Sequence, residues 1–596
     1  MCSNPNYDLE SYERFLDEHL HKQFETPDEN DAMKLKPVLQ ELTTLDKIDQ
    51  NGLHKLLCKH KVAQYRKNSF LIQSLYILIE KKEIEQRYED HIKNLLRIKR
   101  CKSHSGILSI TVFTSPYPSY IDDSGRQRTQ MFTCAFDCAY CPKEEGQPRS
   151  YLKGEPGVLR ANRYGFDTCN QLWGRLCQLD HIGHNLRNAK LEILVLGGTW
   201  TSYPLPYREQ FIRDTYYAAN TFHDKTKRDR LSLSQEKILN KDANCRIIGL
   251  TVEFRPDSVT KQELINLRSY GCTRVQLGVQ HIDNDVLKGV NRKCTTERFK
   301  KALQLLKNSC YKVDIHIMPN LPFSSPQKDR DMMNSFLGLN TPIKKEYIDD
   351  IEWEHYDIRE PDISADQWKL YPCETVPYTD IEQWYREGKY IPYDKDELYS
   401  ILYDAKRAMY PWIRTNRIIR DIPLGYVIAS SDRPNTGQML LDDLKKNGHH
   451  CMCIRCRETK EKHWDGNYQI VVRHYKASGG NEYFISAESK DKLTLYGFTR
   501  LRLGEPATHI FPELEGCALI RELHVYSNMN PVGEDINTVQ HKGIGKKLIS
   551  MAETISKNNG YNNIAVISGV GSQRYYEKLG YFNDSEGVGD YMIKNF

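Results

Sequence analysis

The stretch Cys134-Ala135-Phe136-Asp137-Cys138-Ala139-Tyr140-Cys141 places three cysteines within eight residues at the spacing C-x3-C-x2-C. Three thiolates spaced in this way can bind three irons of a 4Fe–4S cube and leave the fourth iron without a protein ligand. S-adenosylmethionine chelates such an open iron, and one electron then cleaves it to a 5′-deoxyadenosyl radical. A zinc ion would need a fourth ligand, for which residues 131–145 supply only carboxylates. We therefore expect Cys134, Cys138 and Cys141 to hold a 4Fe–4S cluster.

Short β-rich segments recur around this motif, and each is followed by a turn and a helical stretch. Strands that alternate with helices predict parallel βαβ units, and six in succession predict a partial TIM-like (βα)6 barrel. In such barrels the reactive groups lie at the C-terminal ends of the strands. The predicted strands are Leu108–Phe113, Leu191–Leu196, Ile247–Glu253, Arg274–Gln280, Val313–Met318 and Trp368–Tyr371. Two charged stretches, residues 222–244 and 342–362, interrupt the pattern, and we expect them to be surface insertions.

Gly197 and Gly198 end the second predicted strand. They resemble the glycine motif with which radical S-adenosylmethionine proteins bind the methionine amine, where a side chain would block the backbone's approach. Tyr140, just before the last cysteine, is similar to the aromatic residue that packs near the adenine in these proteins. We expect all three residues to bind S-adenosylmethionine.

A second motif lies near the C-terminus, where Gln540, Gly543 and Gly545 form the pattern Q-x-x-G-x-G at the start of a predicted helix. Unpaired N–H groups at a helix start, aided by the helix dipole, can bind the pyrophosphate of acetyl-CoA. A predicted strand, Glu522–Tyr526, precedes this loop, and the segment 572–581 with Tyr576 follows it. These features predict an acetyltransferase domain of the GNAT fold.

Between the two regions, Cys451, Cys453 and Cys456 form a C-x-C-x2-C pattern beside two histidines. Three thiolates and an imidazole suit a structural zinc ion, which would brace the junction between the two large domains. The fourth ligand stays open among His449, His450, His463 and His474. The alternative is a linker that carries reduced thiols.

The length of 596 residues predicts several domains, since one hydrophobic core rarely grows so large. We place the boundaries at 1–103 (helical and basic), 104–440 (radical S-adenosylmethionine domain), 441–475 (zinc-binding linker) and 476–596 (acetyltransferase). The basic clusters within residues 55–67 and 93–102 predict an arm that contacts nucleic-acid phosphates, with solvated helix faces as the alternative.

The sequence has no apolar run long enough for a membrane helix and no secretory signal, so we expect no membrane partner. Seventeen cysteines without an export signal favour a reducing compartment. We expect the cytoplasm, with the nucleus as the alternative.

From about residue 100 onward the chain resembles the family of Elongator catalytic subunits, which join a radical S-adenosylmethionine domain to an acetyltransferase domain and modify tRNA. The resemblance rests on Leu196–Thr199, Thr251–Asp257, Tyr270–Arg274, Gly278–Gln280, Lys369–Pro372, Arg420–Pro423, Arg521–Tyr526 and Ala565–Gly571. The chain departs from the family in the compact spacing of its first two cysteines, and in Cys294 and Asn320, which replace a usual His and Asp.

The resemblance implies that the adenosyl radical takes a hydrogen atom from the methyl group of acetyl-CoA. The carbon radical then adds to C5 of the wobble uridine of tRNA, and thioester hydrolysis leaves 5-carboxymethyluridine. By position it implies acetyl-CoA contacts at Lys190, Glu522, Leu523, His524, Val525, Ile544, Gly545, Lys546 and Tyr576, with Lys190, Glu522 and Tyr576 as catalytic residues. The implied partners are the tRNA anticodon loop, and either other Elongator-type subunits or a second copy of the chain.

Two other functions fit parts of this pattern. One is a protein lysine acetyltransferase of the histone type, in which the cluster is structural and Glu522 is the general base for the acceptor amine. The other is a non-catalytic tRNA-binding scaffold subunit, which would have lost cluster ligands or the acyl-CoA loop. Neither loss occurs in the sequence.

Overall fold

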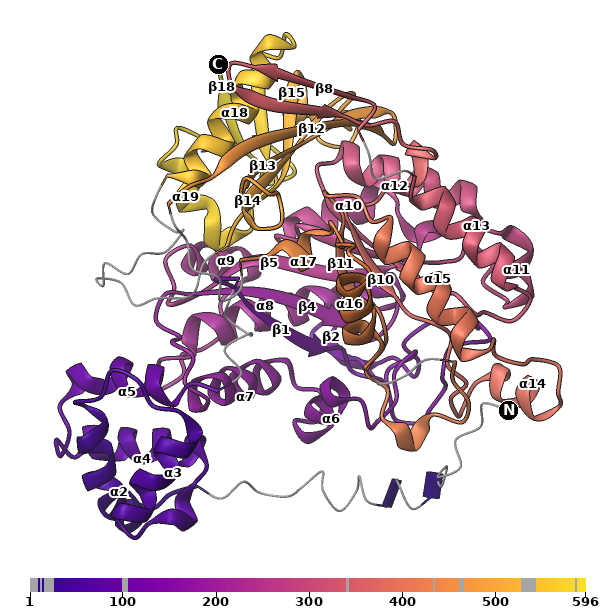
Figure 1. The fold of residues 1–596 in the computed structure, drawn as a ribbon. Coiled ribbons are helices and arrows are strands. Elements are labelled where there is room, and N and C mark those ends of the chain that lie inside the picture. Colours follow the sequence, from indigo (N-terminus) through magenta and orange to yellow (C-terminus); the bar gives the residue numbers. More distant parts are fainter. Residues whose placement is uncertain are drawn as a thin grey trace.

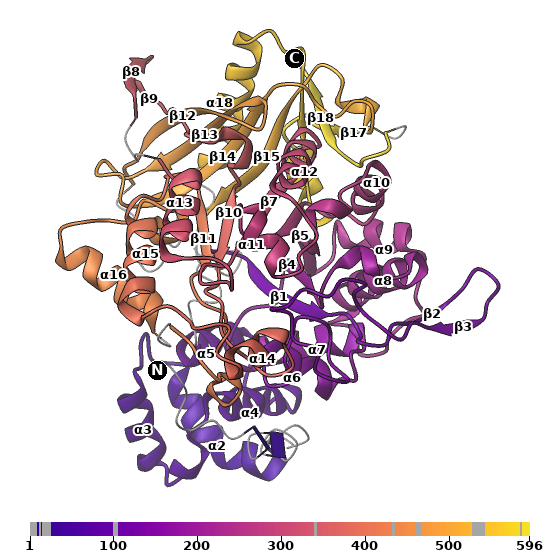
Figure 2. The same ribbon diagram turned by 90° about the vertical axis from the view of Figure 1, so that its right-hand side faces the viewer.

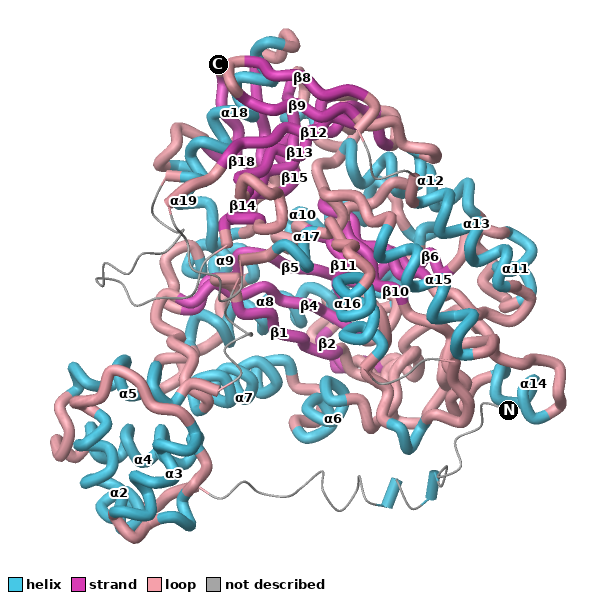
Figure 3. The backbone as a smooth tube through the Cα atoms, in the orientation of Figure 1, coloured by secondary structure: helices cyan, strands magenta, loops and turns pink. Residues whose placement is uncertain are grey.

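The computed structural model of the chain describes residues 9–10, 13–14, 26–98, 105–338, 342–431, 435–459, 466–526, 543–584 and 587–596. It contains a helical N-terminal body, a curled parallel sheet and a mixed C-terminal sheet (Figure 1). The strands gather in two groups, one in the middle of the molecule and one near the C-terminus (Figure 3).

The N-terminal body is a small helical bundle with its own apolar core. Its longer helices are α2 (Glu29–Leu42), α3 (Gln50–Lys59), α4 (Asn68–Glu80) and α5 (Glu89–Leu96). Leucines on the facing sides of these helices are almost fully buried. Asp180 ties the bundle to the rest of the chain, since it accepts hydrogen bonds from Tyr76 Oη and Lys93 Nζ, both at 2.6 Å. The described part of this region is therefore helical, as the sequence predicts.

The central sheet has seven parallel strands and curls into an open half-barrel (Figure 1). In order across the sheet, the strands are β1 (Leu108–Phe113), β4 (Ala189–Leu196), β5 (Cys245–Phe254), β6 (Arg274–Gln280), β7 (Lys312–Ile317), β10 (Gln367–Leu370) and β11 (Arg414–Arg417). All six predicted strands are confirmed within a few residues. The sequence missed β11, because its polar residues Arg414–Arg417 give no apolar alternation.

Helices connect the parallel strands, and one more helix, α16, follows the last strand β11. They are α6 (Pro156–Arg163), α7 (Thr168–His181), α8 (Leu205–Thr221), α9 (Leu233–Asn240), α10 (Lys261–Ser269), α11 (Asn284–Gly289), α12 (Thr296–Asn308), α13 (Pro326–Phe336), α14 (Asp380–Arg386), α15 (Lys395–Arg407) and α16 (Thr436–Lys446). A two-stranded hairpin of β2 (Ser119–Ile121) and β3 (Gln127–Thr129) projects from the body at the right of Figure 2.

The C-terminal sheet has nine strands and carries the helix α18 (Ile544–Asn558) and the short α19 (Gln573–Glu577). Its order is β17 (Phe582–Asn583), β18 (Met592–Asn595), β16 (Asn563–Val566), β15 (Cys517–Val525), β14 (Leu495–Leu503), β13 (Gly480–Glu488), β12 (Gln469–Ala477), β9 (Ile351–His355) and β8 (Lys344–Ile348). Its continuous run of strands from β12 onward begins at Gln469, inside the segment predicted as a linker, and β8 and β9 join its edge from earlier in the chain.

The expectation that residues 342–362 form a surface insertion holds for the exposed edge strand β8 but is wrong for β9. Strand β9 pairs in parallel with β12 and extends the C-terminal sheet. Its charged residues are buried, because Glu354 accepts a hydrogen bond from Arg473 Nε at 2.7 Å and is also paired with Lys492. Alternating charges that would normally be solvated are thus neutralised inside the sheet.

The two sheets share one apolar core and a buried ion-pair network. Trp412 stacks on Tyr475 with ring centroids 4.2 Å apart. Arg521 of β15 is buried and contacts Asp366, just before β10, at 2.6 Å and Glu482 of β13 at 2.8 Å. The two halves of the molecule are therefore held in a fixed arrangement. Within the described residues, none of the helices has both the length and the apolar character to cross a membrane.

Candidate active site

One continuous cavity of about 910 Å³ runs from the curled sheet to the C-terminal sheet. At one end it is lined by Tyr140 and Glu253, and at the other by Glu522, His524 and Tyr576. A smaller pocket of about 90 Å³ adjoins it and shares several lining residues, among them Tyr140 and Glu253. The cavity thus joins the two regions that the sequence motifs single out.

The smaller pocket is formed around the first cysteine motif. Cys134, Cys138, Cys141, Tyr140 and Gly198 all line it. Cys138 is buried, whereas Cys134 and Cys141 are half-buried. The structure therefore brings together the three predicted cluster ligands and two of the three residues predicted to bind S-adenosylmethionine.

Two arginines that the sequence analysis did not select approach the sulfur of Cys138. Arg255 Nη1 and Arg292 Nη1 both donate to Cys138 Sγ at 3.6 Å. Burial opposes ionisation of this thiol, but the charges of Arg292 and Arg255 outweigh it and lower the pKa of Cys138. The thiolate that a metal cluster requires is therefore favoured at this position. Such a contact depends on the fold and leaves no local sequence signal.

Gly197 and Gly198 have φ angles of +136° and +102°, which L-residues with side chains rarely adopt. A Cβ atom on Gly197 would lie 2.0 Å from Thr114 Oγ1. Tyr203 Oη also donates to the carbonyl of Gly197 at 2.7 Å. The two glycines are therefore required by the turn at the end of β4, where Gly198 exposes its backbone to the pocket.

Polar side chains inside the barrel line the cavity between the cysteine pocket and the C-terminal sheet. Tyr151 Oη donates to both carboxylate oxygens of Glu253 at 2.9 Å, and burial raises the pKa of Glu253 despite the nearby Lys369. Lys369 Nζ donates to Gln276 Oε1 at 2.6 Å. Nε2 of His316 is buried without a hydrogen-bond partner among the described residues. All of these residues except Tyr151 lie on predicted strands, but the sequence assigns no role to them.

Glu522 lies at the C-terminal end of the cavity between two cations. Lys312 Nζ and Arg500 Nε each donate to its carboxylate at 2.8 Å. Burial alone would raise its pKa, but these two cations lower the pKa of Glu522 to about 2. A carboxylate held by two cations in this way is a weak proton acceptor.

His524 points an unpartnered, buried Nε2 into the same region, within the part of the chain that the structure describes. Its ring packs beside Tyr526, with centroids 4.3 Å apart. Burial lowers the pKa of His524 to about 4, although the charge of Glu522 opposes this shift. The imidazole is therefore neutral at physiological pH and can accept a hydrogen bond.

The other predicted acetyl-CoA residues fall into two groups. Leu523 and the buried Tyr576 line the cavity. The rest line neither the cavity nor the smaller pocket: Lys190, Val525, Gly543, Ile544, Gly545 and Lys546. Gln540 lies outside the described residues.

Lys190 is half-buried on β4, and burial together with the nearby Arg246 lowers its pKa. Gly543 precedes α18 with a φ of +81°, and Ile544 is part of the apolar core. Among the described residues at the start of α18, backbone groups and the exposed Lys546 and Lys547 are therefore available to a ligand.

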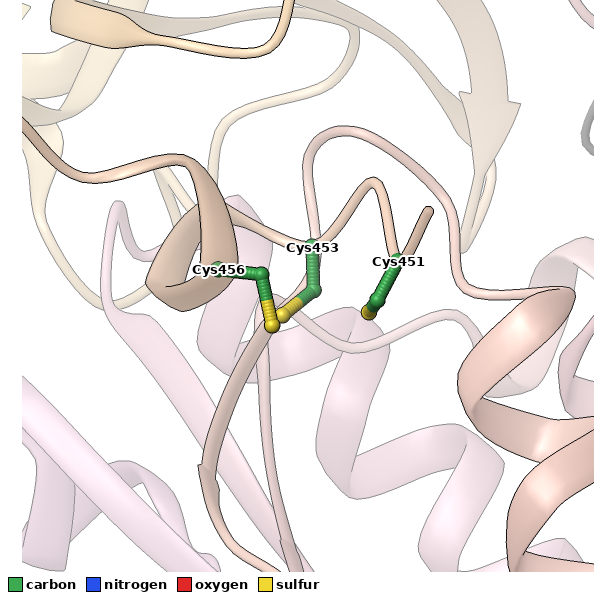
Figure 4. Close-up of side chains that lie close together, drawn as sticks. All are labelled: Cys451, Cys453 and Cys456. Atoms are coloured by element: carbon green, nitrogen blue, oxygen red, sulfur yellow. The ribbon is translucent and has the colours of Figure 1, made fainter. Parts of the chain in front are cut away.

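The second cysteine triplet forms a compact group. The sulfurs of Cys451, Cys453 and Cys456 lie within 4.8 Å of one another, and those of Cys453 and Cys456 lie side by side in Figure 4. No described histidine joins them, so the expected imidazole ligand is not found among His449, His450 and His474. The predicted alternative, His463, lies outside the described residues.

The buried Lys406 approaches this triplet instead of a histidine. Its Nζ lies 3.5 Å from Cys453 Sγ and 3.4 Å from Cys456 Sγ. Burial opposes its charge, but the neighbouring thiolates raise the pKa of Lys406. The three thiolates fit three ligand positions of a single zinc ion, and the charged Lys406 lies beside them as a counter-ion rather than as a ligand. Arg457, next to the triplet, contacts Glu488 of the C-terminal sheet at 2.8 Å.

The half-barrel and its cysteine pocket define a radical S-adenosylmethionine protein. Residues 131–333 match the Radical SAM superfamily, and residues 365–446 match the radical SAM C-terminal domain. The chain belongs to the family of Elongator complex protein 3 and the tRNA uridine(34) acetyltransferases.

This membership rests on relatives that align over nearly the whole chain. The tRNA uridine(34) acetyltransferase of Methanocaldococcus jannaschii is 32% identical over 92% of this chain and 96% of its own length. Elongator complex protein 3 of Saccharomyces cerevisiae is 31% identical over 92% of each chain. The structure of archaeal Methanocaldococcus infernus Elp3 with an N-terminal deletion covers 83% of this chain and all of its own, with 30% identity and a TM-score of 0.64.

Proposed function

We propose that the protein modifies the wobble uridine of tRNA to 5-carboxymethyluridine, with acetyl-CoA as the source of the new carbon atoms. The observation that carries this proposal is the continuous cavity between the cysteine pocket and β15. A reaction between an acetyl group and a radical needs both reagents in one enclosed space, because diffusion through water would quench the radical. The relatives named as tRNA uridine(34) acetyltransferases support the choice of substrate.

The cysteine pocket fits a 4Fe–4S cluster on Cys134, Cys138 and Cys141, since guanidinium groups already favour a thiolate there. When bound, such a cluster with S-adenosylmethionine supplies a 5′-deoxyadenosyl radical, which can activate the methyl group of acetyl-CoA for addition to C5 of uridine. Tyr140 and the backbone of Gly198 would hold S-adenosylmethionine in place. Gly197 shapes the turn that presents Gly198.

At the other end, the C-terminal sheet with α18 acts as a GNAT-type acetyltransferase domain. Backbone N–H groups at Gly543–Lys546, with Gln540, would bind the CoA pyrophosphate. Leu523 and Tyr576 line the space for the thioester, and Glu522, fixed by Lys312 and Arg500, sets the position of β15 beside it. His524 offers its neutral Nε2 to the water that hydrolyses the thioester. Lys190 and Val525 are outside the cavity wall and would act through their neighbours.

Two further parts of the molecule support this role. We assign a structural zinc ion to Cys451, Cys453 and Cys456, because it would fix the junction between the half-barrel and the C-terminal sheet. The helical N-terminal body would contact the tRNA, and its anticodon loop would reach the cavity as a splayed single strand. Relatives named as Elongator complex protein 3 support assembly with further subunits.

One observation argues against the alternative function of a protein lysine acetyltransferase. It requires a general base near the acceptor amine, and Glu522 is held ionised by two cations with a pKa of about 2. A scaffold without catalysis is also disfavoured, because both the cysteine pocket and the wall of the thioester site are intact.

An anaerobic assay tests the proposal. It contains the protein with reconstituted cluster, reductant, S-adenosylmethionine, acetyl-CoA and tRNA, and nucleosides are identified by mass spectrometry. We expect carboxymethyluridine with the native chain and with a Cys177→Ala control, which changes an exposed cysteine of α7 outside both triplets. Cys138→Ala should abolish it. Acetylation of protein lysines without any modified nucleoside would contradict the proposal.

A further inference from the structure

Two arginines lie together at the edge of the main cavity, away from both the cysteine pocket and β15. Arg160 comes from α6 and Arg175 from α7, the two helices that lie beside the edge strand β1 (Figure 1). Both line the cavity wall, together with Ser109 and Thr111 of β1. The two helices can lie close together because Gly174 of α7 has no side chain. A Cβ atom there would lie 2.0 Å from the hydroxyl of Tyr164 at the end of α6.

Neither guanidinium has a carboxylate partner within the described residues. Arg160 donates from Nη2 to the carbonyl of Thr111 at 2.8 Å, and Arg175 donates from Nη1 to Gln178 Oε1 at 3.2 Å. The Nε atom of Arg160 is buried without a hydrogen-bond partner in the part of the chain that the structure describes. Several buried arginines of the molecule do have acidic partners, as Arg521 has Asp366 and Arg473 has Glu488.

This arrangement is electrostatically unfavourable as it stands. Burial and the positive charge of Arg175 lower the pKa of Arg160 to about 10, and burial also lowers the pKa of Arg175. Two like charges that share a low-dielectric wall repel one another unless an anion neutralises them. Guanidinium groups bind phosphate through forked N–H donors, and the hydroxyls of Ser109 and Thr111 add neutral donors at the same wall.

We propose that Arg160 and Arg175 form a phosphate-binding site in the cavity wall, which holds a backbone phosphodiester of the substrate RNA beside the target nucleotide. The identity of the RNA rests on the proposed function. Phosphate contacts fix the register of a nucleic acid without reading its sequence, so this site would position the uridine between the two reacting ends of the cavity. The same chemistry would accept a phosphate of CoA, which is the second source.

Binding measurements separate these sources. Arg160→Gln, Arg175→Gln and their combination are compared with Arg407→Gln, which removes a half-exposed arginine of α15 that lines neither the cavity nor the smaller pocket. If the site binds an RNA phosphodiester, each single variant should weaken tRNA binding by about tenfold. The slope of log affinity against log salt concentration should also fall in magnitude by about one. The KM for acetyl-CoA should stay unchanged. A raised KM for acetyl-CoA with unchanged tRNA affinity would assign the site to CoA instead and overturn the RNA assignment.

If tRNA affinity, its salt slope and the KM for acetyl-CoA all match the Arg407→Gln control, no phosphate site exists there. Thermal unfolding of each variant shows whether it is folded. Arg175→Lys, which keeps the charge, should retain most of the affinity and so guards against a purely structural effect. The binding assay needs no turnover, so it still tests the site if the native chain forms no carboxymethyluridine.

Discussion

At the scale of single residues, charges around the cysteine pocket are set by contacts between distant segments. Arg292 follows α11 yet reaches Cys138 Sγ, 154 positions earlier in the sequence. We expect Arg292→Gln to reduce the iron retained after reconstitution, because the thiolate of Cys138 loses a cation that favours it. Iron and sulfide content and the visible absorbance of the cluster measure this. Arg298→Gln on the exposed side of α12 is the control, and equal iron content in both variants would contradict the assignment.

Gly197 and Gly125 both have a positive φ angle, so alanine substitutions at the two positions can be compared. Gly197→Ala should destabilise the protein by about 2 kcal/mol or more, because its φ is +136° and the new Cβ would meet Thr114 Oγ1 at 2.0 Å. Gly125→Ala, in the β2–β3 hairpin, has φ +76° but open space around it, and should cost only about 1 kcal/mol. Thermal unfolding and S-adenosylmethionine binding measure both. Equal losses in the two variants would show that the close contact at Gly197 is unimportant.

The ion pairs of Glu522 predict a specific dependence on pH. Its pKa is lowered from 4.5 to about 2, so its contribution to stability is complete above about pH 4.5 and is lost as the pH falls toward 2. Glu522→Gln should therefore destabilise the chain by about 3 kcal/mol near neutral pH, since it leaves two buried cations unpaired. Denaturant unfolding should show this difference narrowing from about pH 5 to about pH 3. The control is Glu515→Gln, at an exposed position before β15; a constant difference from native across the range would refute the ion-pair account.

At the scale of elements, the cysteine segment before β12 contacts both the half-barrel and the C-terminal sheet. Ile454 N donates to Ile413 O at 2.9 Å beside β11, and Arg457 reaches Glu488 of β13. Cys453→Ser should lose about one zinc ion per chain and lower the melting temperature, because the ligand set falls to two thiolates. Metal analysis and thermal unfolding test this. Cys177→Ser, an exposed cysteine on α7, should change neither, and a native zinc content in Cys453→Ser would contradict the site.

Elements also show what the sequence could and could not predict. Six barrel strands and the helix α18 carry strong apolar periodicity, so their ranges follow from the sequence. The strands β8, β9 and β11 could not be predicted in this way, because they lack apolar periodicity and are stabilised by tertiary contacts. In β9, for example, Glu354 is neutralised by Arg473 across the sheet. Cysteine spacing likewise predicts both candidate metal-binding triplets. Lys406, by contrast, lies 47 positions from Cys453 and gives no local signal.

At the scale of the whole molecule, the proposed chemistry depends on the fixed distance between the two ends of the cavity. That distance is held by the shared core and by the buried pair of Arg521 and Asp366, which joins β15 to the start of β10. Asp366 Oδ2 also accepts from the backbone N–H of Val313 in β7, at 2.9 Å. Loss of this carboxylate would leave Arg521 facing only Glu482 and would weaken the contact between the sheets.

Asp366→Asn should therefore cost about 3 to 5 kcal/mol, as expected when one partner of a buried ion pair is removed. We expect calorimetry to show two unfolding transitions in place of one, because the sheets would no longer unfold as a unit. S-adenosylmethionine cleavage and acetyl-CoA hydrolysis, measured separately, should each survive below the first transition, whereas their coupled product should fall. Asp404→Asn, on the exposed side of α15, serves as the control. A single transition at the control's temperature, with product formation intact, would mean that this ion pair does not maintain the geometry of the cavity.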